Sequence, residues 1–383
     1  MRRSCHAIFA VLFVLGGPYR PAAQVRVPPS ASLDVQIASA PMPVRIGGRI
    51  HLAYELHLTN FRAVDLALTS IEVLGGTRDS VPLVTYRDDG LRAGLARAGS
   101  PRDGADARVI RSGLRVVCFV WLALDESHAV PSTLHHRISF DVLGATDREA
   151  GTVDSGRVDV RRDAPVVLDA PLRGGPWVAV YDPSSIGGHR RALFAIDGRA
   201  RIPACFAIDW IRLDDDGRVW RGDASTPSNI PGYGAEVLAV ADGVVVAAVS
   251  GFPEPTKPVT LDNAVGNYVT VDIGGGRFAS YEHLQPDSLR VKVGERVRSG
   301  QVLARLGASG SVSSGPHLHF HVSDANSPLG AEGLPFVFRT FEALGSFESL
   351  EALGGGKPWA PVPSERVGTR RMEMPHQQSV VRF

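Results

Sequence analysis

Three histidines stand at alternate positions in the segment His317-Leu318-His319-Phe320-His321. A β-strand sends alternate side chains to the same face, so the segment predicts three imidazoles on one face of one strand. The preceding turn residues, Gly315 and Pro316, favour a strand over a helix. Neutral imidazole is a common zinc ligand, and ligands on one rigid element need little rearrangement to meet one ion. The alternative is that these histidines lie on an exposed sheet face without a ligand.

A hydrolytic zinc site needs three protein ligands and an open position for water, so other segments must contribute. His189 lies in a glycine-containing loop. Asp209 precedes the apolar Trp210-Ile211, where a carboxylate is costly unless it is paired or bound to a metal. We therefore favour Asp209 as the acidic ligand, with a salt bridge to an arginine as the alternative. His283 ends a predicted strand, and a histidine in such a position, taken alone, more often has a structural role.

The totals indicate a folded chain of ordinary composition. At 383 residues it exceeds the usual size of one core, so two domains are expected. Apolar residues make up 44% and charged residues 21%, which argues against long disorder. The net charge of +1 gives no strong field to attract nucleic acid or an anionic membrane, so no nucleic-acid partner is expected.

The first residues resemble a signal for export. Arg2 and Arg3 precede an apolar run that is too short to span a bilayer, and residues 1–24 are therefore predicted to be a signal peptide. Export would place the mature chain in the periplasm or outside the cell, and no later segment predicts a transmembrane helix. Cys118 and Cys205 lie in different predicted domains, so we expect two unpaired buried thiols.

An all-β chain is expected. Residues 33–162 read as short strands separated by polar turns, which predicts an immunoglobulin-like β-sandwich. His51 and His57 fall in an alternating strand and are expected on the sheet surface. His128, His135 and His136 fall in a proline-containing segment that predicts a loop.

A linker is expected at residues 161–176, because arginine, proline and glycine gather there. Residues 176–340 then read as antiparallel hairpins and form the second domain. The tail, residues 341–383, is expected to pack on this domain or follow it. Residues 341–353 predict a short helix and residues 379–383 a last strand.

Five motifs follow one another in the second domain: Ala239-Val240-Ala241-Asp242-Gly243-Val244-Val245, Gly266-Asn267-Tyr268-Val269, Tyr281-Glu282-His283-Leu284, Val293-Gly294-Glu295-Arg296-Val297-Arg298-Ser299-Gly300-Gln301-Val302 and Gly315-Pro316-His317-Leu318-His319-Phe320. In order and spacing they resemble peptidase family M23, the lysostaphin and LytM-like zinc endopeptidases that cut peptidoglycan cross-links. The resemblance covers residues 182–337, under half of the chain. It implies an antiparallel β-sheet peptidase domain with one Zn²⁺ per chain and a peptidoglycan peptide as substrate.

The resemblance also implies roles for particular residues. His189, Asp209 and His319 would hold the zinc, and His317 and His283 would flank the attacking water and act as the catalytic pair. Two departures stand out. The family's first two ligands commonly lie four residues apart, whereas His189 and Asp209 lie twenty apart, so Cys205 is a rival first ligand. His321 stands where the family often has glutamate, and it is either a partner of a ligand or an extra ligand.

Two other functions fit parts of the sequence. One is a non-catalytic protein of the same fold that binds peptidoglycan or activates another hydrolase. The other is a biotinyl or lipoyl carrier domain, which the glycine-punctuated segment around Gly294 and Gly300 also resembles. A carrier needs a lysine at an exposed hairpin tip, and neither Lys257 nor Lys292 is placed for that.

Overall fold

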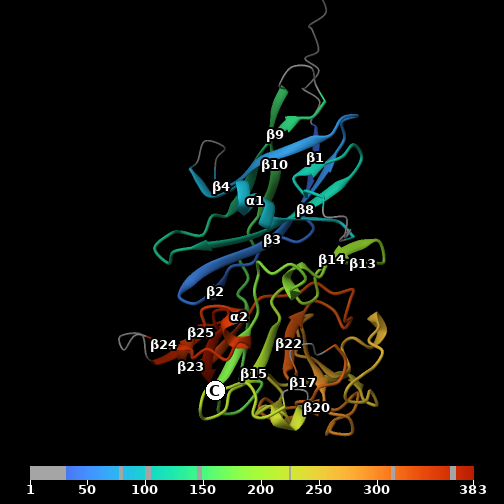
Figure 1. Cartoon of the computed structure of the whole chain (residues 1–383), viewed down its shortest axis with the longest axis vertical. Helices are drawn as coiled ribbons and strands as arrows, with labels where there is room; N and C mark the ends of the chain where they lie inside the picture. Colours follow the sequence, from blue (N-terminus) through green and yellow to red (C-terminus); the bar gives the residue numbers. More distant parts are fainter. Residues whose placement is uncertain are drawn as a thin grey trace, which may run out of the picture.

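The computed structural model describes residues 32–76, 81–99, 105–144, 149–223, 226–311, 315–362 and 368–383. The predicted signal peptide lies outside these residues. Strands dominate, and the α-helices of the described residues are the short α1 (Asp88–Gly94) and α2 (Leu350–Gly354). The expected all-β class is therefore confirmed. Figure 1 shows an N-terminal β-structure packed end to end on a second β-structure that holds the rest of the chain.

Two five-stranded antiparallel sheets make up the N-terminal part. The first has the order β1 (Leu33–Gln36), β3 (Arg49–Asn60), β8 (Arg115–Leu124) and β6 (Leu95–Arg97), with β2 (Val44–Ile46) also on β3. The second has the order β10 (Glu149–Asp159), β9 (Thr133–Val142), β4 (Leu66–Gly75) and β5 (Pro82–Arg87), with β7 (Val109–Ile110) also on β4.

A shared core joins these two sheets into a sandwich. Leu52 and Leu122 of the first sheet pack in one apolar cluster with Ile71 and Ile138 of the second. The strand order agrees with the immunoglobulin type, in which A, B, E and D form one sheet and G, F and C the other. The immunoglobulin-like type stays a prediction, with which this strand order is compatible.

The second part is built on a twelve-stranded sheet. Its order is β11 (Val166–Leu168), β23 (Phe336–Ser346), β26 (Ser379–Arg382), β12 (Trp177–Val180), β15 (Ile208–Arg212), β22 (Leu318–Ser323), β19 (Phe278–Leu284), β18 (Asn267–Asp272), β17 (Gly243–Val249) and β20 (Arg296–Val297), with β24 (Ala360–Pro361) and β25 (Gly368–Glu373) also on β23. All of these pairs are antiparallel except β11 with β23. Smaller elements flank the sheet: the hairpin of β13 (Phe194–Ile196) and β14 (Arg199–Arg201), the pair of β16 (Glu236–Leu238) and β21 (Val302–Arg305), and the 3-10 turns η1 (His189–Arg191), η2 (Pro227–Asn229) and η3 (Leu261–Asn263).

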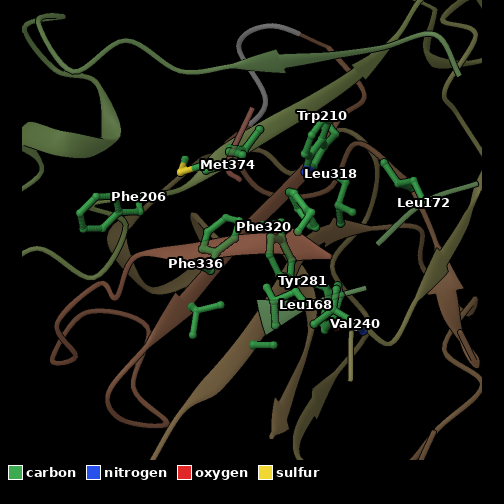
Figure 2. Packing of buried hydrophobic residues seen from close by; sticks show 14 of the residues in the cluster. Leu168, Leu172, Phe206, Trp210, Val240, Tyr281, Leu318, Phe320, Phe336 and Met374 are labelled. Carbon is green, nitrogen blue, oxygen red and sulfur yellow. Dashed lines mark hydrogen bonds between the residues drawn. The ribbon is translucent and has the colours of Figure 1, made fainter. Parts of the chain in front are cut away.

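The alternation along β22 determines which of its side chains enter the core. Leu318 and Phe320 are fully buried and pack with Trp210, Tyr281 and Phe336, as Figure 2 shows. Full burial of such a side chain contributes about 1.5–3 kcal/mol, so this pattern fixes which face of the strand points inward. The histidines at the alternate positions are thereby directed to the opposite face.

The first sheet of the sandwich is covered on both faces. One face packs on the second sheet, and on the other Val117 and Phe119 belong to the same apolar cluster as Phe206 of the second part. Because the second part covers this face, His51 and His57 are buried. The expectation that they lie on the sheet surface is therefore wrong. His135 and His136 were also expected in a loop, but they lie in β9.

The tail departs from its predicted form. Residues 341–346 continue β23, so the expected helix over residues 341–353 is limited to α2. β26 confirms the last strand, and it lies inside the twelve-stranded sheet. Because β11 also joins this sheet from within the expected linker, we propose that the second domain begins at Val166. Cys118 and Cys205 are buried and unpaired, as expected.

Candidate metal centre

His189, Asp209 and His319 converge from three separate segments. One ligand atom of each lies within 4.8 Å of the other two. Nδ1 of His319 lies 2.8 Å from Oδ1 of Asp209, and Nε2 of His189 lies 3.4 Å from Oδ2. The sheet register explains the first contact, since Asp209 of β15 stands directly opposite His319 of β22. His189 comes instead from η1, outside the sheet.

The Asp209 carboxylate is surrounded by imidazoles. Among the described residues its short contacts with basic side chains are with His189, His317 and His319, so the alternative salt bridge to an arginine is not found. Burial alone would raise the pKa of Asp209. The imidazoles of His189 and His317 and the hydrogen bond with His319 nevertheless hold this pKa far below its ordinary range. The carboxylate is therefore ionised, which is the form that binds metal.

His319 lies between two carboxylates. It stands opposite Asp209 on one side and opposite Glu282 of β19 on the other. Burial would lower the pKa of His319, but Glu282 and Asp209 raise it to about 9. The two carboxylates thus favour a positive charge at the position of His319. The imidazole nitrogens of His189 and His319 and a carboxylate oxygen of Asp209 form a donor set that fits zinc.

His317 and His283 lie beside this donor set. Their ring centroids are 4.8 Å apart, and Nε2 of His317 is 3.5 Å from Oδ1 of Asp209. Nδ1 of His317 donates to the main-chain oxygen of Gly315 at 2.7 Å, and Nδ1 of His283 donates to that of Ser309 at 2.9 Å. A carbonyl only accepts hydrogen bonds, so each neutral ring carries its proton on Nδ1 and its lone pair on Nε2. Burial, reinforced by His317 and His319, lowers the pKa of His283 well below its ordinary value.

The backbone is unusual at His283. Consecutive residues of a strand face opposite sides, yet Glu282 and His283 both line the same cavity. His283 has a φ of 62°, in the left-handed region, which accounts for the turn of its side chain toward the cavity. Nearby, Gly266 also has a positive φ, and a Cβ there would lie 2.5 Å from Ser309. The absence of that atom lets Ser309 approach and accept the hydrogen bond from His283.

Cys205 and His321 have different positions relative to this site. Cys205 belongs to neither potential ligand group found among the described residues, and its buried thiol lies near Arg190 and Glu332. The rival ligand set with Cys205 therefore has no support from the geometry. Nδ1 of His321 lies 3.2 Å from Nε2 of His319, where it can accept the proton of that nitrogen. His321 and His319 also form a second potential ligand group with Glu282.

A cavity of about 630 Å³ opens onto these residues. His189, His283, His319 and His321 lie in its wall, and the rest of the wall is mixed apolar and polar. These further residues include Phe194, Ile196, Leu261, Asp262, Tyr268 and Glu282. This volume and this lining are typical of a site for a small molecule or a peptide segment.

Four imidazoles and Glu282 thus line the cavity, and Asp209 and His317 contact this group from beside it. Such a group of imidazoles and carboxylates could hold a metal ion. Residues 229–330 match the sequence model described as peptidase family M23. The chain therefore contains a peptidase family M23 domain, as its motifs predict. His283, His317 and His319 fall within the match, whereas His189 and Asp209 precede it.

Two curated relatives come from Vibrio cholerae. Peptidoglycan DD-endopeptidase ShyB is 35% identical over 109 residues, which are 28% of this chain and 21% of ShyB. Peptidoglycan DD-endopeptidase ShyC is 36% identical over 87 residues, which are 23% of this chain and 17% of ShyC. The chain thus spans about a fifth of the length of the curated relatives it matches.

Solved structures with some likeness include the catalytic domain of the antimicrobial peptidase lysostaphin from Staphylococcus simulans. It is 20% identical, with 42% of this chain and 88% of that chain covered and a TM-score of 0.23. A zinc-containing peptidase from Vibrio cholerae is 16% identical, with 76% and 81% covered and a TM-score of 0.23.

Some residues of the site were not expected from the sequence. Glu282 stands in the Tyr281 to Leu284 motif but was given no role, although the register places it directly opposite His319. Ser309 and Gly315 act through main-chain oxygens, which carry no side-chain signal. Only the positions of the neighbouring glycines could have pointed to such close backbone contacts.

Proposed function

We propose that this chain is an exported zinc metallo-endopeptidase that hydrolyses peptide bonds in peptidoglycan. The observation that carries the proposal is the convergence of His189, Asp209 and His319 beside one cavity, with His283 and His317 next to them. The M23 domain and the relatives named peptidoglycan DD-endopeptidases support the substrate class.

His189, Asp209 and His319 would hold the ion. A zinc ion bound there would supply Lewis acidity, which activates water and polarises a carbonyl group. His317 and His283 would move the proton, since in each neutral ring Nε2 carries the lone pair while a main-chain oxygen holds the Nδ1 proton. One of the two would take a proton from the attacking water. The other, once protonated, would donate to the oxyanion that forms.

Glu282 and His321 would orient the imidazole of His319, since Glu282 stands directly opposite it and His321 lies within hydrogen-bond distance. With Nδ1 of His319 directed toward Asp209, Nε2 of His319 would donate to Nδ1 of His321. Such a partner fixes the ring's tautomer and its direction. In this proposal His321 would be a hydrogen-bond partner of the ligand His319 and not a ligand itself.

Export rests on the sequence of residues 1–24, which resembles a signal peptide. Within the described ranges no helix is long and apolar enough to cross a membrane. A mature protein in the periplasm or outside the cell would meet peptidoglycan directly. The non-catalytic alternative is not favoured, because all five expected site residues are present and adjacent.

The test is to incubate the zinc-loaded full chain with intact peptidoglycan and to identify the released fragments by mass. We expect peptide fragments from wild type, none from His319→Ala with zinc binding lost, and none from His317→Ala with zinc binding kept. His128→Ala, which changes an exposed histidine of the sandwich, is the matched control and should release as much as wild type. Retained release by both site variants, or no release by a zinc-loaded wild type, would refute the proposal.

A further inference from the structure

The candidate ligand His189 is followed directly by an arginine that enters the N-terminal sandwich. The guanidinium of Arg190 pairs with Glu55 of β3 through Nη1. Its Nη2 donates to the main-chain oxygens of Tyr54, at 3.0 Å, and Val120, at 3.3 Å. The guanidinium also lies 5.3 Å from the ring centre of Phe119. Arg190 thus contacts both β3 and β8.

This ion pair is buried. The Arg190 side chain is 2% exposed and that of Glu55 is 5% exposed. Loss of one partner from such a pair leaves an uncompensated charge, which is strongly destabilising. The guanidinium is therefore held firmly in the sandwich, and with it the adjacent backbone. Arg191 adds a second contact, since its guanidinium lies 5.3 Å from the same Phe119 ring centre and donates to Ala93.

The surrounding interface is apolar and continuous. Val44, Val117 and Phe119 of the sandwich belong to one buried cluster with Phe206 and Ile208 of the second domain. The ring centres of Trp121 and Phe206 are 5.7 Å apart. A large apolar interface holds two domains in one relative position. The contacts of Arg190 therefore fix η1 relative to β15, which carries Asp209.

His189 needs this support more than its partners do. Asp209 and His319 lie on neighbouring strands of the large sheet, whereas His189 lies on a single 3-10 turn. The turn's own hydrogen bonds are few: the amides of Gly188, Arg191 and Ala192 each donate to the carbonyl three residues earlier. Such a short turn has little stability of its own.

We propose that the N-terminal sandwich is a structural part of the metal centre. Arg190 is a positioning residue that holds His189 toward Asp209 and His319, and Glu55 is its counter-ion. The inference rests on the proposed function only for the identity of the ion, because the docking of η1 on the sandwich consists of contacts within the chain itself.

The test compares two double variants of the full chain. Arg190→Met with Glu55→Leu removes the buried pair and leaves no uncompensated charge, an exchange that is often neutral for folding. Arg382→Met with Glu342→Leu removes an exposed pair, joined at 3.1 Å, and is the matched control. Arg190→Lys is a third variant, which keeps a charge opposite Glu55 but lacks the planar fork that reaches two carbonyls.

Zinc affinity is measured by competition with a chelator, and unfolding of the metal-free protein by heating. We expect the buried-pair variant to bind zinc about 10- to 100-fold more weakly while its unfolding temperature stays near that of wild type. Arg190→Lys should show a smaller loss, and the control none. The visible absorption of the cobalt-substituted protein should change in the buried-pair variant, because the ligand set changes.

Hydrogen exchange of the metal-free protein gives a readout that needs no zinc. The amides of Gly188, Arg191 and Ala192 should exchange at least about 10-fold faster in the buried-pair variant than in the control. If wild type binds no zinc, the proposed function fails, and the exchange rates still decide the inference. Unchanged exchange at these amides, or wild-type zinc affinity in a folded buried-pair variant, would overturn it.

Discussion

His136 is an imidazole that the fold of the sandwich keeps neutral. It is fully buried in β9, where its Nδ1 donates to the main-chain oxygen of Gly156 at 2.9 Å. Its Nε2 can therefore accept from the hydroxyl of Tyr54 at 2.7 Å. Burial is the main cause that lowers the pKa of His136 to about 4, and His135 adds to it.

The sign of the effect on stability follows from this direction. The pKa of His136 is 6.5 in the unfolded chain and about 4 in the folded one, so the folded state binds the proton less readily. The neutral His136 side chain therefore contributes its full share to the free energy of unfolding above pH 6.5, and this contribution is lost as the pH falls toward 4. Each pKa unit corresponds to about 1.4 kcal/mol, so the loss over this window is about 3 kcal/mol.

The assay is urea unfolding at pH 7 and pH 4.5, followed by tryptophan fluorescence, for wild type and His136→Gln. We expect wild type to lose about 2–3 kcal/mol more free energy of unfolding between these pH values than the variant does. His128→Gln, at an exposed position, should behave as wild type. Equal losses in wild type and His136→Gln would show that this imidazole is not the group responsible.

Three further substitutions test the domain that carries the site. Phe320→Ala should lower the free energy of unfolding by about 3–5 kcal/mol in a denaturant titration, because it empties the core behind β22; a loss under about 1 kcal/mol would contradict that packing. Gly266→Ala should cost about 2 kcal/mol or more, since its φ is positive and the Cβ would meet Ser309; wild-type stability would disprove the close approach. His321→Ala should weaken zinc binding about 10- to 100-fold in a chelator competition, and an unchanged affinity would exclude His321 as the partner of His319.

The strand of the histidines and the position of Asp209 could be predicted because their signals are local. Alternation alone places Leu318 and Phe320 in the core and the imidazoles opposite, and the structure has this arrangement. Asp209 beside Trp210 predicts a strand residue that needs a partner. The hairpins from β17 to β19 could be predicted for the same reason, since glycine turns separate short apolar segments of the sequence.

Other features depend on contacts between segments far apart in the sequence. His51 and His57 look like surface residues because period-two alternation cannot show that both faces of a sheet are covered. Nothing near Arg190 in the sequence indicates that its partner is Glu55. Likewise, the choice of His189 over Cys205 depends on the path of the twenty-residue segment before Asp209, which no local pattern determines.

The order of strands in the large sheet constrains how the chain folds as it emerges N-terminus first. β12 is made early, yet one of its two neighbours is β26, and β11 pairs with β23. The strands of the sandwich, in contrast, pair within residues 33–159. A domain whose strands have all emerged can fold first, so the sandwich would be complete while the large sheet still lacks strands. The turn η1, which carries His189, could then dock on the folded sandwich before β15 and β22, which carry Asp209 and His319, pair with each other.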